Sequence, residues 1–266
     1  MQRHWGSEID LKEKSLPTLK FQFIQPYILA KNIKILEIGS GNGKVLHTIH
    51  KLNKTAKLYG CDINDVKKPK YNFTQILKDT TKLPYKDKYF DVVVCMDVIE
   101  HVKEYKRYIR EIKRILKPGG IFCGFCPCEG NTFSSYSLAK LILGKNIFIR
   151  TKEHVNSFKT DHLEFMLNYH FEKTEYNYSY HILGQIMDAT LYSLMIIPKV
   201  EKLFWNENKY YNKKKNINKS FISKVFNELL TLANGIAYFE SYHLKHVRSL
   251  STGLHFKTIR KVMPDE

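Results

Sequence analysis

The sequence predicts an α/β fold: a doubly wound sheet of seven mostly parallel strands, with a helical insertion before the last strand. In the first half of the chain, short apolar runs alternate with segments of helical periodicity, the pattern of successive β-α-β units. This half opens on an apolar run that leads into three alternating glycines (ILEIGSGNGKVL, 35–46). Near the end, two strand-like runs, 171–180 and 253–262, enclose a long stretch with helical periodicity.

Each expected element has its own local signal. Five strands of the first half are short apolar runs, at 35–38, 57–61, 73–77, 91–96 and 121–126. Between the fourth and the fifth, apolar residues recur at helical spacing from Tyr105 to Leu116, and Pro118-Gly119-Gly120 should end that helix. A short helix is expected at 136–143 and a longer one from Thr160.

The segment 181–250 is expected to form the helical insertion, set into a domain built from residues 1–180 and 251–266. It holds two apolar helical stretches, divided at Pro198 and by the lysine-rich segment 213–219 (KKKNINK). In the second stretch six apolar residues share one helical face: Ile222, Val225, Phe226, Leu229, Ala233 and Ile236. Such a face either packs on the sheet as a cap or rests on a membrane surface.

Composition limits the class of protein. A chain of 266 residues, 43% apolar, can bury a large core. The first ten residues contain no apolar signal segment, and the longest membrane-like run, 191–197, is far shorter than the ~20 residues of a spanning helix. Five cysteines without an export signal indicate reduced thiols in a cytoplasmic protein. The net charge of +17 attracts polyanions such as nucleic acid or an anionic membrane, unless lysine is merely frequent throughout.

The glycine-rich turn after the first strand favours a cationic ligand over a phosphate. A P-loop needs Ser or Thr after Gly-Lys, where this chain has Val45, and a dinucleotide fingerprint needs glycine where it has Lys44. Glu37, at the end of the strand, would repel a pyrophosphate but attract the ammonium and sulfonium groups of S-adenosylmethionine. Glycines would let the backbone approach the amino-acid part of that cofactor: Gly39, Gly41 and Gly43.

Two further segments extend this site. Asp62, in YGCDIN (59–64), ends the second strand, where an acid can accept both hydroxyls of a ribose. The long run LKDTTKLPYKDKYFDVVVCMDVIEHV (77–102) and the later YIREIKRILKPGG (108–120) then resemble the class I S-adenosylmethionine-dependent methyltransferases, in particular their broad small-molecule group. That resemblance covers about 35–126 and implies a Rossmann-like fold.

The resemblance also implies roles for individual residues. Glu37 and the three glycines would line the methionine part of the cofactor, and Asp62 would hold its ribose. Asp79 would meet the adenine amino group with Thr80 beside it, and Met96 would lie along the cofactor.

Methyl transfer to an alcohol or a phenol needs a base near neutral pH, which suits histidine. His101 follows the fourth strand, at the rim where open α/β sheets bind their ligands. His154, in KEHVNSF (152–158), lies on the segment that would cover this rim. We therefore predict His101 and His154 as the catalytic residues.

Two groups of residues have metal-like spacing, but no metal is predicted. Asp97, Glu100 and His101 form D-x-x-E-H, which resembles the E-x-x-E-H of the ubiquinone-pathway O-methyltransferases and is a set of groups able to hold a divalent cation. The Glu-His pair also occurs widely without metal. In C-x-x-C-x-C (123–128), Cys123 and Cys126 would point to opposite faces of a strand, which argues against zinc.

The methyl acceptor is weakly specified. The fourth strand ends in CMDVIEH (95–101), without the Asn/Asp-Pro-Pro-aromatic turn by which many methyltransferases hold a nucleobase. The leading hypothesis is O-methylation of a small-molecule, lipid or lipid-linked glycan acceptor by a cytoplasmic protein that can touch an anionic membrane. The charge keeps an RNA or DNA methyltransferase as the alternative, and a non-catalytic cofactor-binding module is the third possibility.

Overall fold

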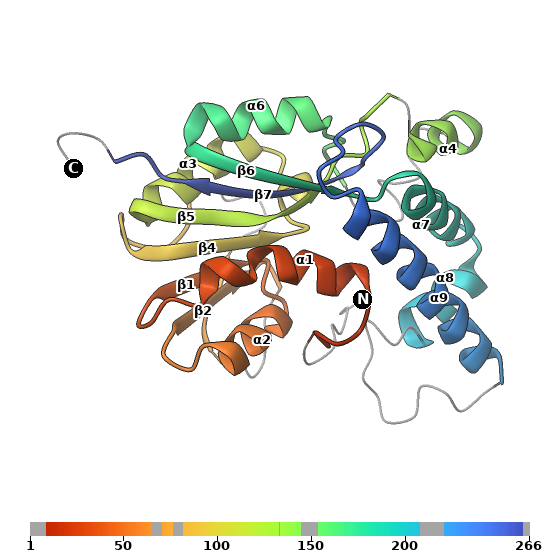
Figure 1. Ribbon diagram of the computed structural model, residues 1–266, viewed down its shortest axis with the longest axis horizontal. Coiled ribbons are helices and arrows are strands. Elements are labelled where there is room, and N and C mark those ends of the chain that lie inside the picture. Colours follow the sequence, from red (N-terminus) through yellow and green to blue (C-terminus); the bar gives the residue numbers. More distant parts are fainter. Residues whose placement is uncertain are drawn as a thin grey trace.

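The computed structural model describes residues 9–64, 71–76, 82–132, 134–144, 154–207 and 221–262. Its seven strands form one sheet in the order β3-β2-β1-β4-β5-β7-β6 (Figure 1). The strands are β1 (Lys34–Ile38), β2 (Lys57–Asp62), β3 (Asn72–Gln75), β4 (Phe90–Met96), β5 (Leu116–Pro127), β6 (Glu172–Ser179) and β7 (Gly253–Ile259). Only β7 runs antiparallel to its neighbours β5 and β6, so the predicted mostly parallel sheet is confirmed.

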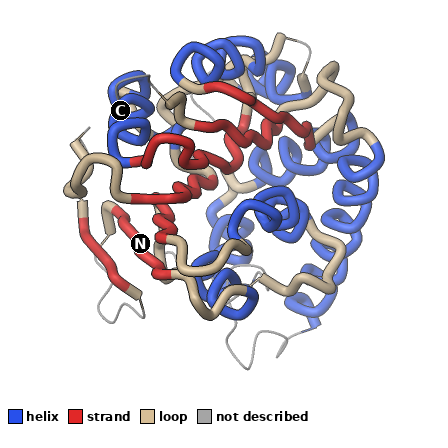
Figure 2. The backbone as a smooth tube through the Cα atoms, turned by 60° about the vertical axis from the view of Figure 1, so that its left-hand side comes forward, coloured by secondary structure: helices blue, strands red, loops and turns tan. Residues whose placement is uncertain are grey.

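Helices cover both faces of this twisted sheet (Figures 1 and 2). They are α1 (Leu16–Ile24), α2 (Lys44–Leu52), α3 (Tyr105–Ile115), α4 (Ser135–Leu143), α6 (Thr160–His170), α7 (Ile182–Leu194), α8 (Pro198–Glu207) and α9 (Phe221–His243), with 3-10 turns η1 (Gln25–Ile28) and η2 (Ile99–His101). Helix α3 ends at Ile115, before the predicted Pro-Gly-Gly stop, because the chain turns directly into β5 at Leu116.

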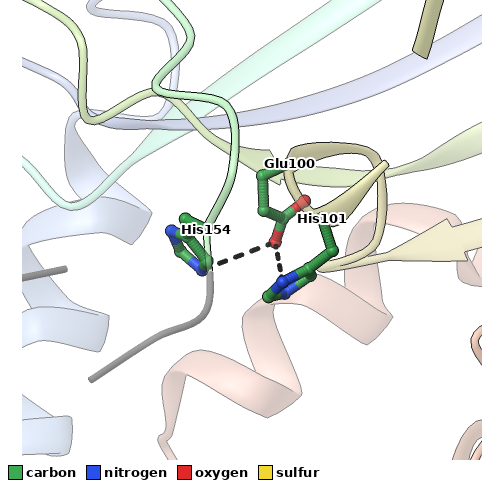
Figure 3. A group of neighbouring side chains, drawn as sticks. All are labelled: Glu100, His101 and His154. Atoms are coloured by element: carbon green, nitrogen blue, oxygen red, sulfur yellow. Dashed lines mark ion pairs between the residues drawn. The ribbon is translucent and has the colours of Figure 1, made fainter. Parts of the chain in front are cut away.

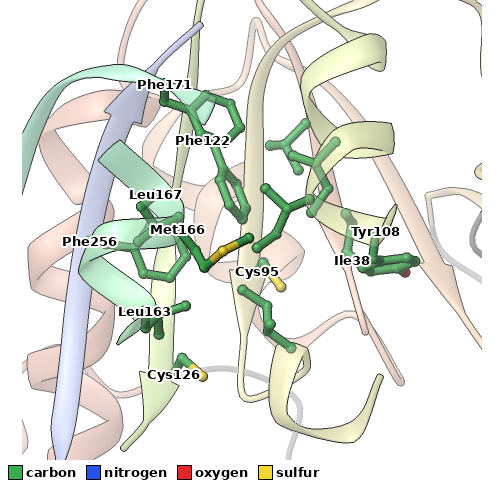
Figure 4. Close-up of a cluster of buried hydrophobic side chains, with 14 of the residues drawn as sticks. Ile38, Cys95, Tyr108, Phe122, Cys126, Leu163, Met166, Leu167, Phe171 and Phe256 are labelled. Carbon is green, nitrogen blue, oxygen red and sulfur yellow. The ribbon is translucent and has the colours of Figure 1, made fainter. Parts of the chain in front are cut away.

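Alternation along the buried strands divides the core into two layers. In β4, Val93 and Cys95 face α3 and α6, whereas Val92 and Val94 face α1 and α2. The first layer is closed by aromatic side chains such as Phe122, which Figure 4 shows packed among residues of α6 and β7. The central strands are continuous apolar runs in the sequence because both of their faces are buried.

The five cysteines are free and buried within this core. Cys123 packs in the layer of α1 and α2, and Cys126 packs in the layer of α3 and α6. The predicted divergence of these two thiols is therefore confirmed, and they cannot act together on one metal ion.

The strand order reverses between β1 and β4. From β1 the sheet continues through β2 to β3, and from β4 it continues through β5 in the other direction. In open α/β sheets the loops on either side of such a reversal separate and leave a crevice at the carboxyl ends of the strands. Here the glycine-rich turn follows β1 and η2 follows β4, so both predicted halves of the site meet at this crevice.

The insertion before β7 contains three described helices rather than the two predicted stretches. Pro198 is the first residue of α8, a position where proline costs no helical hydrogen bond, and α7 has already ended at Leu194. Helix α9 packs against α7 and α1. Within the described residues, none of the helices combines the length and the hydropathy that crossing a bilayer requires.

Helix α9 packs through a face beside its predicted apolar stripe, and the stripe itself is only partly covered. Ile222 and Leu229 of that stripe are 66% and 60% exposed. The inward positions carry mainly small or polar residues: Ser223, Asn227, Leu230, Ala237 and Ser241. The amide of Asn227 donates to the carbonyl of Ser223 one turn earlier, which satisfies the buried polar group within the helix.

A buried histidine in β7 should make the fold sensitive to acid. Burial lowers the pKa of His255 from 6.5 to about 3, and the positive charge of Lys20 adds to this effect. Between about pH 6.5 and 3 the unfolded chain binds a proton here that the folded chain does not, so each unit of falling pH removes ~1.4 kcal/mol of stability. Urea unfolding at several pH values should show a steeper loss for the wild type than for His255→Gln.

His246→Gln, at an exposed histidine, is the matched control and should keep the wild-type slope. Equal slopes for the wild type and His255→Gln would contradict the assignment of this acid sensitivity to His255.

Candidate active site

The turn after β1 holds all three glycines in the left-handed region. Gly39, Gly41 and Gly43 have φ of +72°, +46° and +75°, a conformation that other residues seldom adopt. The N–H of Gly39 donates to the carbonyl of Cys61 at the end of β2 (2.8 Å). A Cβ on Gly39 would lie 2.3 Å from Cγ2 of Val98, in the turn after β4. Glycine is therefore required where the two sides of the crevice approach each other.

Two of the three predicted cofactor carboxylates, Asp62 and Glu37, border this turn. Asp62 accepts a hydrogen bond from the N–H of Gly41 through Oδ2 (2.8 Å) and from the N–H of Asn64 through Oδ1 (2.8 Å). The side-chain amide of Asn64 also donates to Oδ1 (3.0 Å), so Oδ2 is the oxygen with a second lone pair available for a ribose hydroxyl. Glu37 is buried and accepts the N–H of Leu46 (3.3 Å), and burial raises the pKa of its carboxyl above the usual range.

The remaining predicted cofactor residues are less completely placed. Met96 is the last residue of β4, partly buried at the carboxyl end of the sheet. Asp79 and Thr80 lie outside the described residues, so their roles remain predictions.

The other side of the crevice carries a buried acid beside a half-buried histidine. Glu100 and His101 belong to η2, directly after β4. The carboxyl of Glu100 is fully buried, and Nε2 of His101 lies 3.7 Å from its Oε1. Burial, with the nearby carboxylate of Asp97 as the next cause, raises the pKa of Glu100 well above its usual range.

The covering segment is attached to η2 by backbone hydrogen bonds. The N–H groups of Val155 and Asn156 both donate to the carbonyl of Glu100, at 3.1 and 2.9 Å. The side-chain amide of Asn156 donates to the carbonyl of Val102 (2.8 Å). These contacts bring the rings of His154 and His101 together, with centroids 4.9 Å apart.

His154 is held between two buried carboxylates. Its Nδ1 lies 3.2 Å from Oε2 of Glu129, and its Nε2 lies 3.9 Å from Oε1 of Glu100. A carboxylate accepts hydrogen bonds, so the shorter contact with Glu129 favours the neutral tautomer with its proton on Nδ1 and leaves Nε2 as the acceptor on the side of Glu100. Figure 3 shows both imidazoles converging on the same carboxylate oxygen. The two predicted catalytic histidines thus form one cluster.

The D-x-x-E-H spacing suggests that Asp97 belongs to this cluster, but its side chain lies elsewhere. The residue has φ of +54°, and both of its carboxylate oxygens contact Nζ of Lys20 at 2.8 Å. Among the described residues, the ligand atoms that gather within 4.8 Å of one another are those of Glu100, His101 and His154. These are the side chains able to hold a metal ion.

Glu129 and Lys20 are site residues that the sequence reasoning missed. Glu129 follows β5 in CPCEG (126–130), and an acid directly after a central strand was a readable signal. Lys20 had no such signal, because it belongs to α1 and reaches the rim only through tertiary packing. Its ammonium lies 3.7 Å from the ring centroid of Phe125 in β5.

Comparison with known proteins gives a family match for part of the chain. Residues 36–124 match the model described as a methyltransferase domain. The chain is 31% identical over 120 residues to the ubiquinone biosynthesis O-methyltransferase of Pelagibacter ubique, covering 41% of this chain and 47% of the relative. It is 29% identical over 121 residues to the sterol 4-C-methyltransferase strm-1 of Caenorhabditis elegans (41% and 36%), and 32% identical over 118 residues to Probable tRNA methyltransferase 9B of Homo sapiens (42% and 24%). The matched part thus spans less than half of each of these relatives.

Solved structures share the fold across nearly the whole chain. A SAM-dependent methyltransferase from Archaeoglobus fulgidus superposes with a TM-score of 0.52 at 18% identity, covering 94% of this chain and 97% of that one. The cyclase SpnF superposes with a TM-score of 0.56 at 16% identity (99% and 88%). The chain therefore has the Rossmann-like fold of the class I S-adenosylmethionine-dependent methyltransferases, and residues 36–124 match a methyltransferase domain.

Proposed function

We propose that this chain transfers the methyl group of S-adenosylmethionine to a hydroxyl oxygen of a small or lipid-linked molecule. The observation that carries the proposal is the cluster of Glu100, His101 and His154 at the carboxyl end of β4, across the crevice from the glycine turn. A donor held at one side and an activating group at the other is the arrangement that in-line displacement needs.

The cofactor would lie over the glycine turn. The left-handed glycines keep the backbone free of side chains there, and Asp62, which borders the same turn, would accept a ribose hydroxyl through Oδ2. The positive charge of the methionine part would favour the ionised form of the buried Glu37. Met96, Asp79 and Thr80 are proposed to complete the cofactor site, as the resemblance implies.

His154 is proposed as the base that takes the proton of the acceptor hydroxyl, with His101 beside it. The contact with Glu129 fixes which ring nitrogen is protonated and would stabilise the imidazolium that forms. Because the covering segment is bonded to η2, the base is held in place before the acceptor binds. An acceptor methylated on carbon or on an already nucleophilic nitrogen would not need this arrangement.

A lipid-like acceptor is supported by the surface around the insertion. Helix α4 carries Leu141 and Ile142, which are 82% and 71% exposed, and α9 carries the exposed stripe that begins at Phe221 and Ile222. Helix α4 adjoins the covering segment, since Nζ of Lys140 lies 2.7 Å from Oγ of Ser157. With a net charge of +17, these apolar side chains suit peripheral contact with an anionic membrane from the cytoplasm. The segment 181–250 would then be the membrane-facing part of the protein.

Methylation of RNA is the second candidate, because of the same positive charge and the similarity to a tRNA methyltransferase. It predicts RNA affinity that falls steeply with salt. Transfer of label to RNA but to no hydroxyl compound would favour it over the leading proposal. Cofactor binding without transfer to any acceptor would instead indicate a binding module.

Gly39→Ala should weaken cofactor binding by about tenfold or more, because an L-residue at this φ costs ~1–2 kcal/mol and its Cβ meets Val98. Isothermal titration with S-adenosylmethionine checks this. Adding Val98→Ala should recover only the steric part of the loss. Gly235→Ala, in α9 with open space around the position, should bind as the wild type does. If Gly39→Ala binds S-adenosylmethionine with wild-type affinity, the cofactor does not bind at this turn.

His154→Ala should lower the rate of methyl transfer by about 10²–10⁴-fold, the usual contribution of a general base, while cofactor affinity is retained. The measurement is label transfer from S-adenosylmethionine to a panel of catechols, phenols and extracted lipids. Glu129→Gln should lower kcat and change its pH profile, since it disturbs the ring tautomer. His246→Ala is the control. A wild-type rate in His154→Ala would refute its catalytic role.

Cosedimentation with vesicles checks the membrane contact. The protein should bind vesicles rich in phosphatidylserine at low salt, and Leu229→Asp or Ile222→Asp should reduce the bound fraction by interrupting the exposed stripe of α9. Phe165→Asp, at an equally exposed residue of α6, is the matched control and should bind normally. If the wild type does not bind these vesicles at low salt, the proposed membrane contact is wrong.

A further inference from the structure

The cluster at the carboxyl end of β4 has the composition of a two-histidine, one-carboxylate metal site. Oε1 of Glu100 lies 3.7 Å from Nε2 of His101 and 3.9 Å from Nε2 of His154. Ligand atoms on a tetrahedral zinc ion stand ~3.3 Å apart, so these two pairs would close by about half an ångström. The three ligand atoms all lie within 4.8 Å of one another. His101 is at a partly exposed turn and His154 is at the start of the covering segment, so both rings can make that adjustment.

Glu100 gives an independent sign of a missing partner. Its Oε1 is buried and receives no hydrogen bond, although its other oxygen lies 3.7 Å from Sγ of Cys126. A buried carboxylate oxygen without a donor costs stability unless a cation compensates it. The orphaned atom is the one that both imidazoles approach (Figure 3).

The support behind His154 also fits a metal ligand. Histidines that bind metals usually donate their second N–H to a carboxylate, which orients the ring and raises its basicity. Glu129 occupies that position at Nδ1 of His154, and it is itself 3% exposed.

We propose that Glu100, His101 and His154 bind a divalent transition-metal ion, with Glu129 as the outer carboxylate. Two imidazoles and one carboxylate favour zinc, iron(II), cobalt(II) or manganese(II) over magnesium, which prefers oxygen ligands. Asp97 is excluded as a ligand, since Lys20 engages both of its oxygens. This donor set differs from the D-x-x-E-H triplet in taking one imidazole from a distant segment.

The role of such an ion rests on the proposed O-methylation, whereas its binding does not. A bound cation lowers the pKa of an acceptor hydroxyl. Both Nε2 atoms would then be ligands, and proton removal would no longer need His154 as the base. Methyl transfer would accordingly depend on metal at pH values where free hydroxyls are protonated.

Metal titration of the full-length, chelator-treated protein tests the proposal without cofactor or acceptor. Calorimetry with Zn²⁺ should show one ion per chain, and Co²⁺ should give the visible absorption bands of a tetrahedral or five-coordinate site. Glu129→Gln should weaken Zn²⁺ binding by about 10–100-fold, and His101→Ala or His154→Ala by at least as much. His246→Ala should change nothing.

Circular dichroism and cofactor affinity of each metal-free variant report whether it is folded. If the wild type binds no Zn²⁺, the proposed metal site is wrong. It is also wrong if folded His101→Ala and His154→Ala bind Zn²⁺ as the wild type does. Those outcomes would leave methyl transfer untouched. Site-specific metal binding without transfer to any hydroxyl would uphold the site and overturn the proposed function instead.

Discussion

The carbonyl of Glu100 is the point on which the site depends. Two consecutive N–H groups of the covering segment, those of Val155 and Asn156, bind this single oxygen. Together with the bond from the Asn156 side chain to Val102, they hold His154 next to His101, although the two histidines belong to segments far apart in the chain. The same turn presents the buried carboxyl of Glu100 toward both rings. A single carbonyl oxygen that accepts two hydrogen bonds thus fixes this loop beside the candidate active site.

Much of the fold follows from local patterns. The strand of Ile35 and Leu36 is apolar because both of its faces are covered, and the glycines that follow it predict a turn because glycine adopts positive φ without steric cost. Cys123 and Cys126 could be assigned to opposite faces from the alternation of a strand. Such features are set by neighbours in sequence, so the sequence is enough to predict them.

The partners inside the site depend on tertiary contacts and were only partly predictable. His101 and His154 could be nominated because their segments flank the crevice, but the sequence does not say that Glu129 lies behind His154 or that Lys20 takes Asp97. Helix α9 illustrates the same limit. Its periodicity identifies an apolar stripe, yet polar residues that bond back to their own backbone can also be buried. The chain therefore buries a neighbouring face of small, polar and apolar residues.

Helix α1 gives the family match a different meaning. Phe21 and Ile24 of this helix are fully buried against the sheet, and Lys20 reaches across to Asp97 beside the catalytic turn. The segment recognisable as a methyltransferase domain, 36–124, includes neither this helix nor the strands β6 and β7. It is therefore not a portable module. A chain shortened to that segment would lose one wall of its core, and engineered hybrids should exchange this scaffold together with its N-terminal helix.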